Sequence, residues 1–168
     1  MRIFLIFFIS ILATAAGTAP LSAQDQAISL SGSVMHETVS LDASGKEVTE
    51  LVEPNTIVPG DRLIFGTDYN NGSEEAVDNF VVTNPLPPAV RLAPDADTTL
   101  IVSVDGGKSF GTLSQLSVMA EDGGARPAVQ ADVTHVRWTL PSVAPGESGR
   151  LEYPAIIRGP ADDNRHTL

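Results

Sequence analysis

The stretch VPGDRLIFGTDYNNGSEEAV, residues 58–77, decides how this chain folds. Its middle alternates apolar and polar residues with a period of two, so that Leu63, Phe65 and Tyr69 share one face of an extended segment. Charged residues between them face the other way, and turn-forming residues bound the segment on both sides. The pattern predicts a half-buried β-strand between two turns.

Both turns are specified by their residue types. Pro59, Gly60 and Asp61 predict a turn into the strand, in which the carboxylate of Asp61 accepts hydrogen bonds from neighbouring backbone amides. Asn71 and Gly72 predict the turn out of it, because Asn-Gly tolerates the positive φ angles of tight hairpins. We therefore interpret Asp61 as a structural residue and not as a catalytic carboxylate.

The same alternation recurs along the chain. In VTHVRWTL the inward set is Val136, Trp138 and Leu140, and the indole N–H of a buried Trp138 needs a backbone partner. TLIVSV and RLEYPAII alternate in the same way, and turn-rich stretches separate the segments: PLPP, APDAD, EDGGARP and APGESG, the last containing Pro145 and Gly146. The fold class predicted is all-β, an immunoglobulin-like antiparallel sandwich of about seven strands with little or no helix.

The chain divides into four predicted parts. Residues 1–23 have the charge, apolar run and small-residue end of a secretory signal peptide, and Ala23 precedes the expected cleavage point. Residues 24–55 predict the first strands of the domain, a hairpin around DASGK, and residues 56–158 its core. We expect a flexible tail at residues 159–168, and the least structured loop between residues 119 and 130.

Composition narrows the function. The chain has no cysteine, which excludes disulfides and thiolate metal sites, and its net charge is −11. Removal of residues 1–23 takes away one of ten basic residues and none of the 21 acidic ones, leaving about −12. The sequence therefore predicts that the chain does not bind nucleic acid, because contacts to phosphates need clustered Lys and Arg. We expect an exported protein, periplasmic or extracellular, with no membrane-spanning segment in the mature chain.

The order of three motifs resembles a known family. VPGDRLIFGTDYNNGSEEAVDNFVVTNPLPPAVRL, then SVDGGKSFG, then VTHVRWTLPSVAPGESGRLEY are similar to the bacterial envelope and surface repeat family called domain of unknown function eleven, over residues 56–158. Asn84 stands where that family usually has Asp, and Ala144 where Leu is common. The resemblance implies an immunoglobulin-like sandwich outside the cytoplasm with no catalytic residues. The family occurs as tandem copies, whereas one copy is visible here.

SVDGGKSFG carries a competing pattern. Ser103, Asp105, Gly107, Ser109 and Phe110 match the Asp-box of sialidase-like propellers, in which the Asp bonds the backbone of a tight hairpin. A propeller needs several blades, and this chain has one copy of the box. We interpret Asp105 and Gly107 as hairpin residues, and keep a carbohydrate-binding or divergent carbohydrate-active protein as the alternative function.

Catalytic and metal signals are sparse. No serine lies in a Gly-x-Ser-x-Gly elbow, and His36, His135 and His166 share no ligand spacing. The sequence therefore predicts no enzyme and no cofactor. Asp95 and Asp97 are weak candidates for calcium, since exported acidic domains hold the ion with loop carboxylates. A calcium-dependent adhesion module is the third hypothesis.

We expect a structural or protein-binding role in a bacterial cell envelope, with an envelope protein or surface component as partner. Contact is expected through the loops TDYNNGSEEAV and EDGGARP, or through an unpaired sheet edge that accepts a strand.

Overall fold

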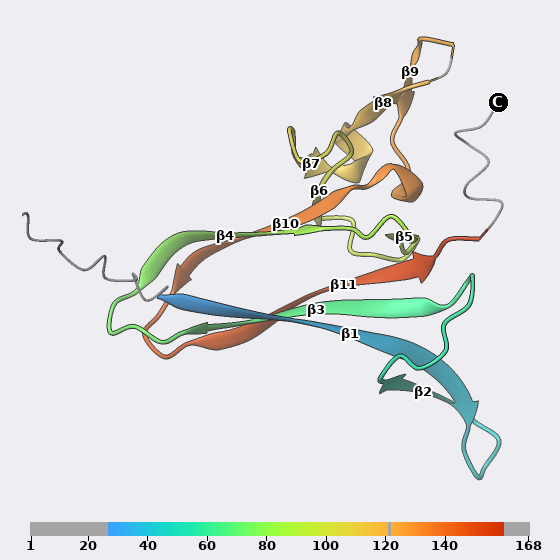
Figure 1. Cartoon of the computed structure of the whole chain (residues 1–168), viewed down its shortest axis with the longest axis horizontal. Coiled ribbons are helices and arrows are strands. Elements are labelled where there is room, and N and C mark those ends of the chain that lie inside the picture. Colours follow the sequence, from blue (N-terminus) through green and yellow to red (C-terminus); the bar gives the residue numbers. More distant parts are fainter. Residues whose placement is uncertain (1–26, 121, 160–168) are drawn as a thin grey trace, which may run out of the picture.

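The computed structural model of the chain describes residues 27–120 and 122–159 (Figure 1). Within these residues the fold is all-β, as predicted, and the only helical elements are two single 3₁₀ turns, η1 (Leu113–Gln115) and η2 (Gln130–Asp132). The predicted leader, residues 1–23, lies outside the described residues, as does the predicted tail from residue 160 onward.

The larger layer, sheet A, holds five antiparallel strands in the order β2-β1-β3-β11-β5. Their bounds are β1 (Ile28–Leu41), β2 (Glu47–Val52), β3 (Arg62–Asn71), β5 (Val90–Leu92) and β11 (Ser148–Ile157). The hairpin predicted around DASGK is present, because β1 and β2 pair from His36 opposite Val52 to Leu41 opposite Glu47. The outer end of this hairpin projects beyond the sandwich (Figure 1).

The second layer, sheet B, has the order β4-β10-β6-β7. Its strands are β4 (Val77–Pro85), β6 (Ile101–Ser103), β7 (Gly111–Thr112) and β10 (His135–Val143). Two further strands, β8 (Ser117–Met119) and β9 (Ala125–Pro127), form a small separate hairpin above sheet B (Figure 1). Eleven strands are thus present in the described residues, where the alternation predicts about seven, because several are only two or three residues long.

The core lies between the two sheets. Its buried members come from both layers and their connections: Leu63, Leu86, Val90, Leu92, Val102, Val133, Val136, Tyr153 and Ala155. Tyr153 of β11 stacks on Phe65 with ring centroids 5.0 Å apart, and lies 6.2 Å from the ring of Trp138 in β10. This face-to-face contact of two antiparallel sheets is that of a β-sandwich.

The predicted inward residues divide between three environments. Leu63 and Val136 are buried, and Phe65 and Trp138 are half-buried against the core. Tyr69 and Leu140 are half-buried and lie outside the core cluster. The indole N–H of Trp138 makes no hydrogen bond to any described residue, so the backbone partner expected for it is absent there.

The segment between residues 119 and 130 is more regular than predicted. β8 and β9 pair there, with Val118 opposite Arg126, and η2 begins at residue 130. Asp132 fixes the segment, since its carboxylate accepts from both terminal nitrogens of Arg126 at 2.7 and 2.8 Å. The Gly-rich turn dominates the local sequence pattern, so this pattern does not reveal the hairpin, which an ion pair with the following turn holds.

Candidate functional site: the free edge of strand β1

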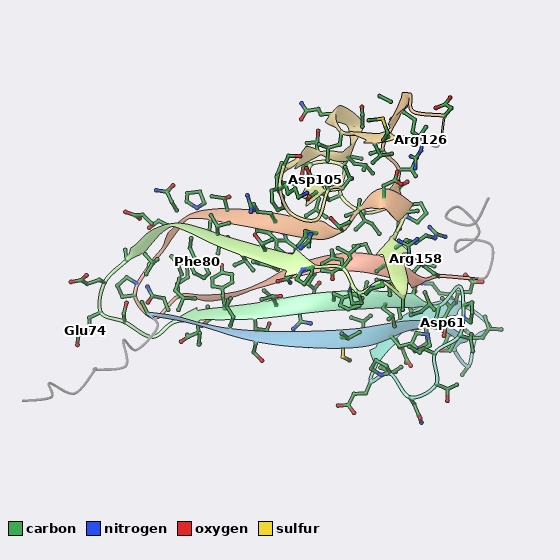
Figure 2. All side chains as sticks on the ribbon, turned by 45° about the horizontal axis from the view of Figure 1, so that its top comes forward. Asp61, Glu74, Phe80, Asp105, Arg126 and Arg158 are labelled. Atoms are coloured by element: carbon green, nitrogen blue, oxygen red, sulfur yellow. The ribbon has the colours of Figure 1, made fainter. Side chains whose placement is uncertain are left out.

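The turn at residues 58–61 is structural. Asp61 Oδ2 accepts a hydrogen bond from the backbone N–H of Val58 at 2.8 Å, and Gly60 has a φ of +96° that favours glycine. Pro59 precedes it in the same turn. Asp61 therefore caps the entry to β3, at the opposite end of the sandwich from Glu74 (Figure 2).

Asn71 and Gly72 do not form a tight hairpin. Neither residue has a positive φ, and β3 and β4 lie in different sheets. The buried Asn71 side chain donates to the carbonyl oxygens of Glu75 and Val143 at 2.8 and 2.9 Å, which fixes a crossing between layers. The hairpin prediction failed because a hydrogen-bonding asparagine, and not backbone permissiveness, is what this turn requires.

Asp105 binds its own loop, as its position in SVDGGKSFG predicts (Figure 2). Its carboxylate accepts from Ser109 N and Oγ and from Ser103 Oγ, the shortest distance being 2.6 Å. The Ser109 hydroxyl is the largest cause that lowers the pKa of this carboxyl below its ordinary 3.8. Gly107 N donates to Ser103 Oγ at 2.9 Å within the same loop. All these donors belong to the protein, so the box acts here as a fold element.

The last predicted turn residues close the connection between β10 and β11. Gly146 N donates to the carbonyl oxygen of Asn71 at 2.8 Å, and Glu147 Oε2 accepts from Ala144 N at 2.7 Å. Pro145 lies between these two contacts. The turn thus joins the end of β3 to the start of β11.

The two calcium candidates are each engaged by the protein. Asp95 Oδ1 accepts from Arg62 at 2.7 Å, and Asp97 Oδ1 accepts from Thr99 N and Oγ1, both at 2.8 Å. Both contacts lower the pKa of the respective carboxyl. Across residues 27–120 and 122–159 no group of three or more His, Asp or Glu side chains could hold a metal ion.

The serines in the turns serve as hydrogen-bonding groups. Ser73 Oγ donates to Asn71 Oδ1 at 2.7 Å, Ser109 Oγ donates to Asp105, and Ser148 Oγ accepts from Asn70 at 2.6 Å. Ser73 and Ser109 are thus oriented within their own turns, and Ser148, at the start of β11, by the amide of Asn70 in the adjacent strand β3. His166 lies outside the described residues.

The two loops expected to make contacts lie far apart. TDYNNGSEEAV spans the end of β3 and the crossing to β4, where Glu74 is exposed, whereas EDGGARP forms the β8–β9 turn near Arg126 (Figure 2). The fold does not bring them into one surface. An unpaired sheet edge, the other contact expected, is present on β1.

Backbone groups of β1 are left open on one side. In an antiparallel ladder, alternate residues bond to one neighbour and the residues between them point the other way. Gly72 N donates to Ala27 O at 3.0 Å, so the odd-numbered residues of β1 bond to β3. Those whose N–H and C=O groups point away from β3 before the β2 pairing begins at His36 are Ile28, Leu30, Gly32 and Val34. Within the described residues no strand pairs with that side of residues 28–35.

The open part of β1 lacks the features that usually protect an edge strand. Residues 28–35 contain no charged side chain and no proline, and their register with β3 is uninterrupted from Ile28 to Glu37. The other long edges are protected: β2 carries Glu47 and Glu50, and β4 carries Asp78, Pro85 and the positive-φ residue Asn79. β5 and β7 are too short to pair extensively.

Beside residues 28–35, sheet A extends one strand, β1, beyond sheet B, since β2 pairs with β1 only from His36 onward. Asn84 of β4 donates to Thr67 of β3 at 2.6 Å, so the outermost strand of sheet B lies over β3 and not over β1. Leu30 points to the inner face, opposite Tyr69, and is 50% exposed because none of the described residues covers it. β1 is therefore accessible along its edge, and over its inner face at Leu30 and Gly32, whereas Ile28 on the same face is buried.

A groove of about 470 Å³ runs under this overhang. Its lining comes from four strands and the segment after β4: Leu30, Gly32, Ser33 and Val34 of β1, Phe65, Gly66 and Thr67 of β3, Asn84 and Pro85 of β4, Tyr153 of β11, and Pro87. A methyl group added at Gly32 would meet no atom within 4 Å. The free edge thus stands beside a mostly apolar groove with space for side chains of an added strand.

Comparison with known proteins finds no family model, no curated protein and no solved structure that matches the chain. None of the helical turns between residues 27 and 159 that the structure describes has the length or apolar character to cross a membrane.

Proposed function

We propose that this chain is a non-catalytic, exported β-sandwich with a structural or protein-binding role in a bacterial cell envelope. It binds an extended segment of its partner by strand addition on the free edge of β1. In this mode main-chain hydrogen bonds supply affinity, and pockets for alternate side chains supply specificity.

The observation that carries the proposal is the uncharged, uninterrupted edge of residues 28–35 beside its groove. An edge of this kind is an aggregation hazard unless something covers it, and the other long edges of this fold are protected. A partner strand would satisfy the outward N–H and C=O groups of Leu30 and Gly32 and place every second side chain over the groove.

Further support comes from the sequence. The leader-like residues 1–23 and the absence of cysteine fit an exported protein that relies on a packed core. The resemblance of residues 56–158 to domain of unknown function eleven, a family of envelope and surface proteins, supports a location in the envelope. Asp105, Asp95 and Asp97, which would carry the lectin or calcium alternatives, each bind protein donors.

The test places a photo-crosslinking amino acid at Ser31, which is exposed on the free edge, and compares it with the same group at Ala43 in the β1–β2 turn. Both proteins are irradiated in envelope fractions of the native host, and the adducts are identified by mass spectrometry. We expect one protein adduct from position 31 and none of that mass from position 43.

A matched pair of substitutions makes the result specific. Gly32→Pro removes an outward N–H that β3 does not use, and so blocks an added strand with little effect on the sandwich. Gly32→Ala keeps the N–H and places a methyl in open space. The adduct should vanish with proline and persist with alanine. Equal adducts from both variants would refute strand addition on this edge.

A further inference from the structure

The open part of β1 is complementary to itself when reversed. We propose that it pairs antiparallel with a second copy of this chain, with residue 28 of one copy opposite residue 34 of the other and Ser31 on the two-fold axis. This inference rests on the proposed function, whose strand-accepting edge it uses, and names the occupant as the same edge of another molecule.

The backbone supports this register. Ile28, Leu30, Gly32 and Val34 present their free N–H and C=O groups outward, and reversal about residue 31 sets Ile28 opposite Val34 and Leu30 opposite Gly32. These become the hydrogen-bonded pairs of the new ladder, each of which exchanges both bonds. Residues 28–34 are the part of the open edge that is symmetric about residue 31, and they end before His36, where the β1–β2 hairpin of either copy would obstruct the partner.

On the inner face, a side chain of each copy would fill an open space on the other copy. Leu30 is half exposed, and Gly32, which it would face across the axis, has open space where a side chain would stand. Each Leu30 would therefore cover the partner's Gly32 at the mouth of the groove. A shift of the register by two residues would set Leu30 against Leu30 and lose this fit.

On the outer face, the paired residues are all serine. Ser29 would lie opposite Ser33 and Ser31 opposite its own copy, and residues 28–34 themselves carry no charge. The one charged side chain that reaches them is Arg150 of β11, which donates to Ser33 Oγ at 2.8 Å and is paired with Asp68 and Glu152. Cross-strand serines suit this position, whereas like charges directly opposite one another destabilise a sheet. A charged residue at position 31 would face its own copy across the axis, so an uncharged window favours pairing with a second copy.

Sheet B leaves room for the pairing. In the dimer, sheet A would continue from one copy into the other in the order β3, β1, β1, β3. Because each β4 lies over its own β3, the two β4 strands would stand apart by the distance between the two β3 strands, and adjacent strands in a sheet are about 4.8 Å apart. The inner faces of the two β1 strands would line the trough between them.

The dimer should be weak and favoured by salt. A seven-residue pairing buries less than the roughly 1,200 Å² of stable interfaces. Each chain carries a net charge of −11, so repulsion opposes association until salt screens it, with a Debye length of about 8 Å at physiological ionic strength.

Disulfide scanning tests the register, since the chain has no cysteine of its own. In purified full-length protein under mild oxidation, Ser31→Cys should crosslink to itself, because the two Cα atoms of this non-hydrogen-bonded pair would lie about 4.5 Å apart. Ser29→Cys alone should yield at least about tenfold less dimer, since its own copy would stand roughly 13 Å away along the strand. A mixture of Ser29→Cys and Ser33→Cys should crosslink between the two variants.

Substitutions at the edge supply the second measurement. Gly32→Pro, made in the cysteine-free protein, should raise the sedimentation dissociation constant at least about tenfold over Gly32→Ala, because a proline in each copy interrupts the ladder twice. Equal crosslinking of Ser29→Cys and Ser31→Cys, or a monomer at every concentration, would overturn the inference. If the purified protein stays monomeric while the proline-sensitive envelope adduct is still found, strand addition stands and the partner is another protein. Loss of both results refutes both proposals.

Discussion

The side-chain amide of Asn71 donates to the carbonyl oxygen of Val143 at 2.9 Å. Asn71 ends β3 in sheet A and Val143 ends β10 in sheet B, so this bond joins the two layers. The same amide donates to Glu75 O, and its oxygen accepts from Ser73 N and Oγ. One fully buried asparagine therefore holds together the crossing from β3 to β4 and the end of β10.

Asn71→Ala should destabilise the protein by about 2–4 kcal/mol, because it leaves the buried carbonyl oxygen of Val143 and the partly buried one of Glu75 without their donor. Urea unfolding followed by the fluorescence of Trp138, the only tryptophan, measures the loss. Asn70→Ala is the control: Asn70 is exposed and donates to Ser148 Oγ, so its removal should cost less than about 1 kcal/mol. Equal losses for the two variants would contradict the role assigned to Asn71.

The local pattern of this sequence was enough to predict the strands and several turns. Alternation placed Leu63 and Val136 in the core, and Asp61 and Asp105 could be assigned to turns because their short side chains reach adjacent amides. Which strand faces which could not be predicted. Asn71-Gly72 has the composition of a hairpin, and only the choice of neighbour for β3 makes it a crossing between sheets.

The free edge was not visible in the sequence for the same reason. Residues 28–35 alternate like any half-buried strand, and whether their outward N–H groups meet another strand depends on how far β2 extends along β1. The one local feature of residues 28–35 is the absence of charged residues and proline. A central strand has the same feature, so it does not identify a free edge. The overhang of sheet A depends on the contact of Asn84 with Thr67, residues in different sheets.

Gly60→Ala and Gly32→Ala separate backbone strain from crowding. A methyl at either position meets nothing within 4 Å, but Gly60 has a φ of +96° and Gly32 does not have a positive φ. Gly60→Ala should therefore cost about 1 kcal/mol, and Gly32→Ala should be neutral or slightly stabilising. Thermal and urea unfolding of the two variants, side by side, test this. A loss of similar size at Gly32 would mean that crowding or entropy dominates.

Asp105→Asn should lower stability at neutral pH, because the carboxylate that accepts from Ser109 and Ser103 is replaced by an amide with one acceptor oxygen. The pKa of Asp105 is lower in the folded protein than its ordinary 3.8, so its contribution is present above that value and is lost as the pH falls toward the folded pKa. The difference between wild type and variant should therefore be constant near neutrality and shrink below about pH 4. Glu74→Gln, in the exposed crossing loop, is the control for the loss of one negative charge. A difference that does not vary with pH would assign the effect to packing.

Tyr153→Phe should change the alkaline limit of stability. Burial raises the pKa of Tyr153 from 10.0 to about 12, so its neutral form is favoured in the folded state. A group whose pKa is raised on folding contributes its full stability below the unfolded value, and loses that contribution as pH rises through the window from 10.0 to about 12. At neutral pH the two proteins should differ by less than about 1 kcal/mol, because the phenyl ring keeps the stacking on Phe65. From about pH 8 to about pH 11 the free energy of unfolding of wild type should fall further than that of Tyr153→Phe, since other titrating groups are common to both. Urea titrations at the two pH values measure this difference, and absorbance at tyrosinate wavelengths follows the ionisation directly. Parallel losses in the two proteins would show that the Tyr153 hydroxyl reaches solvent and ionises without opening the core.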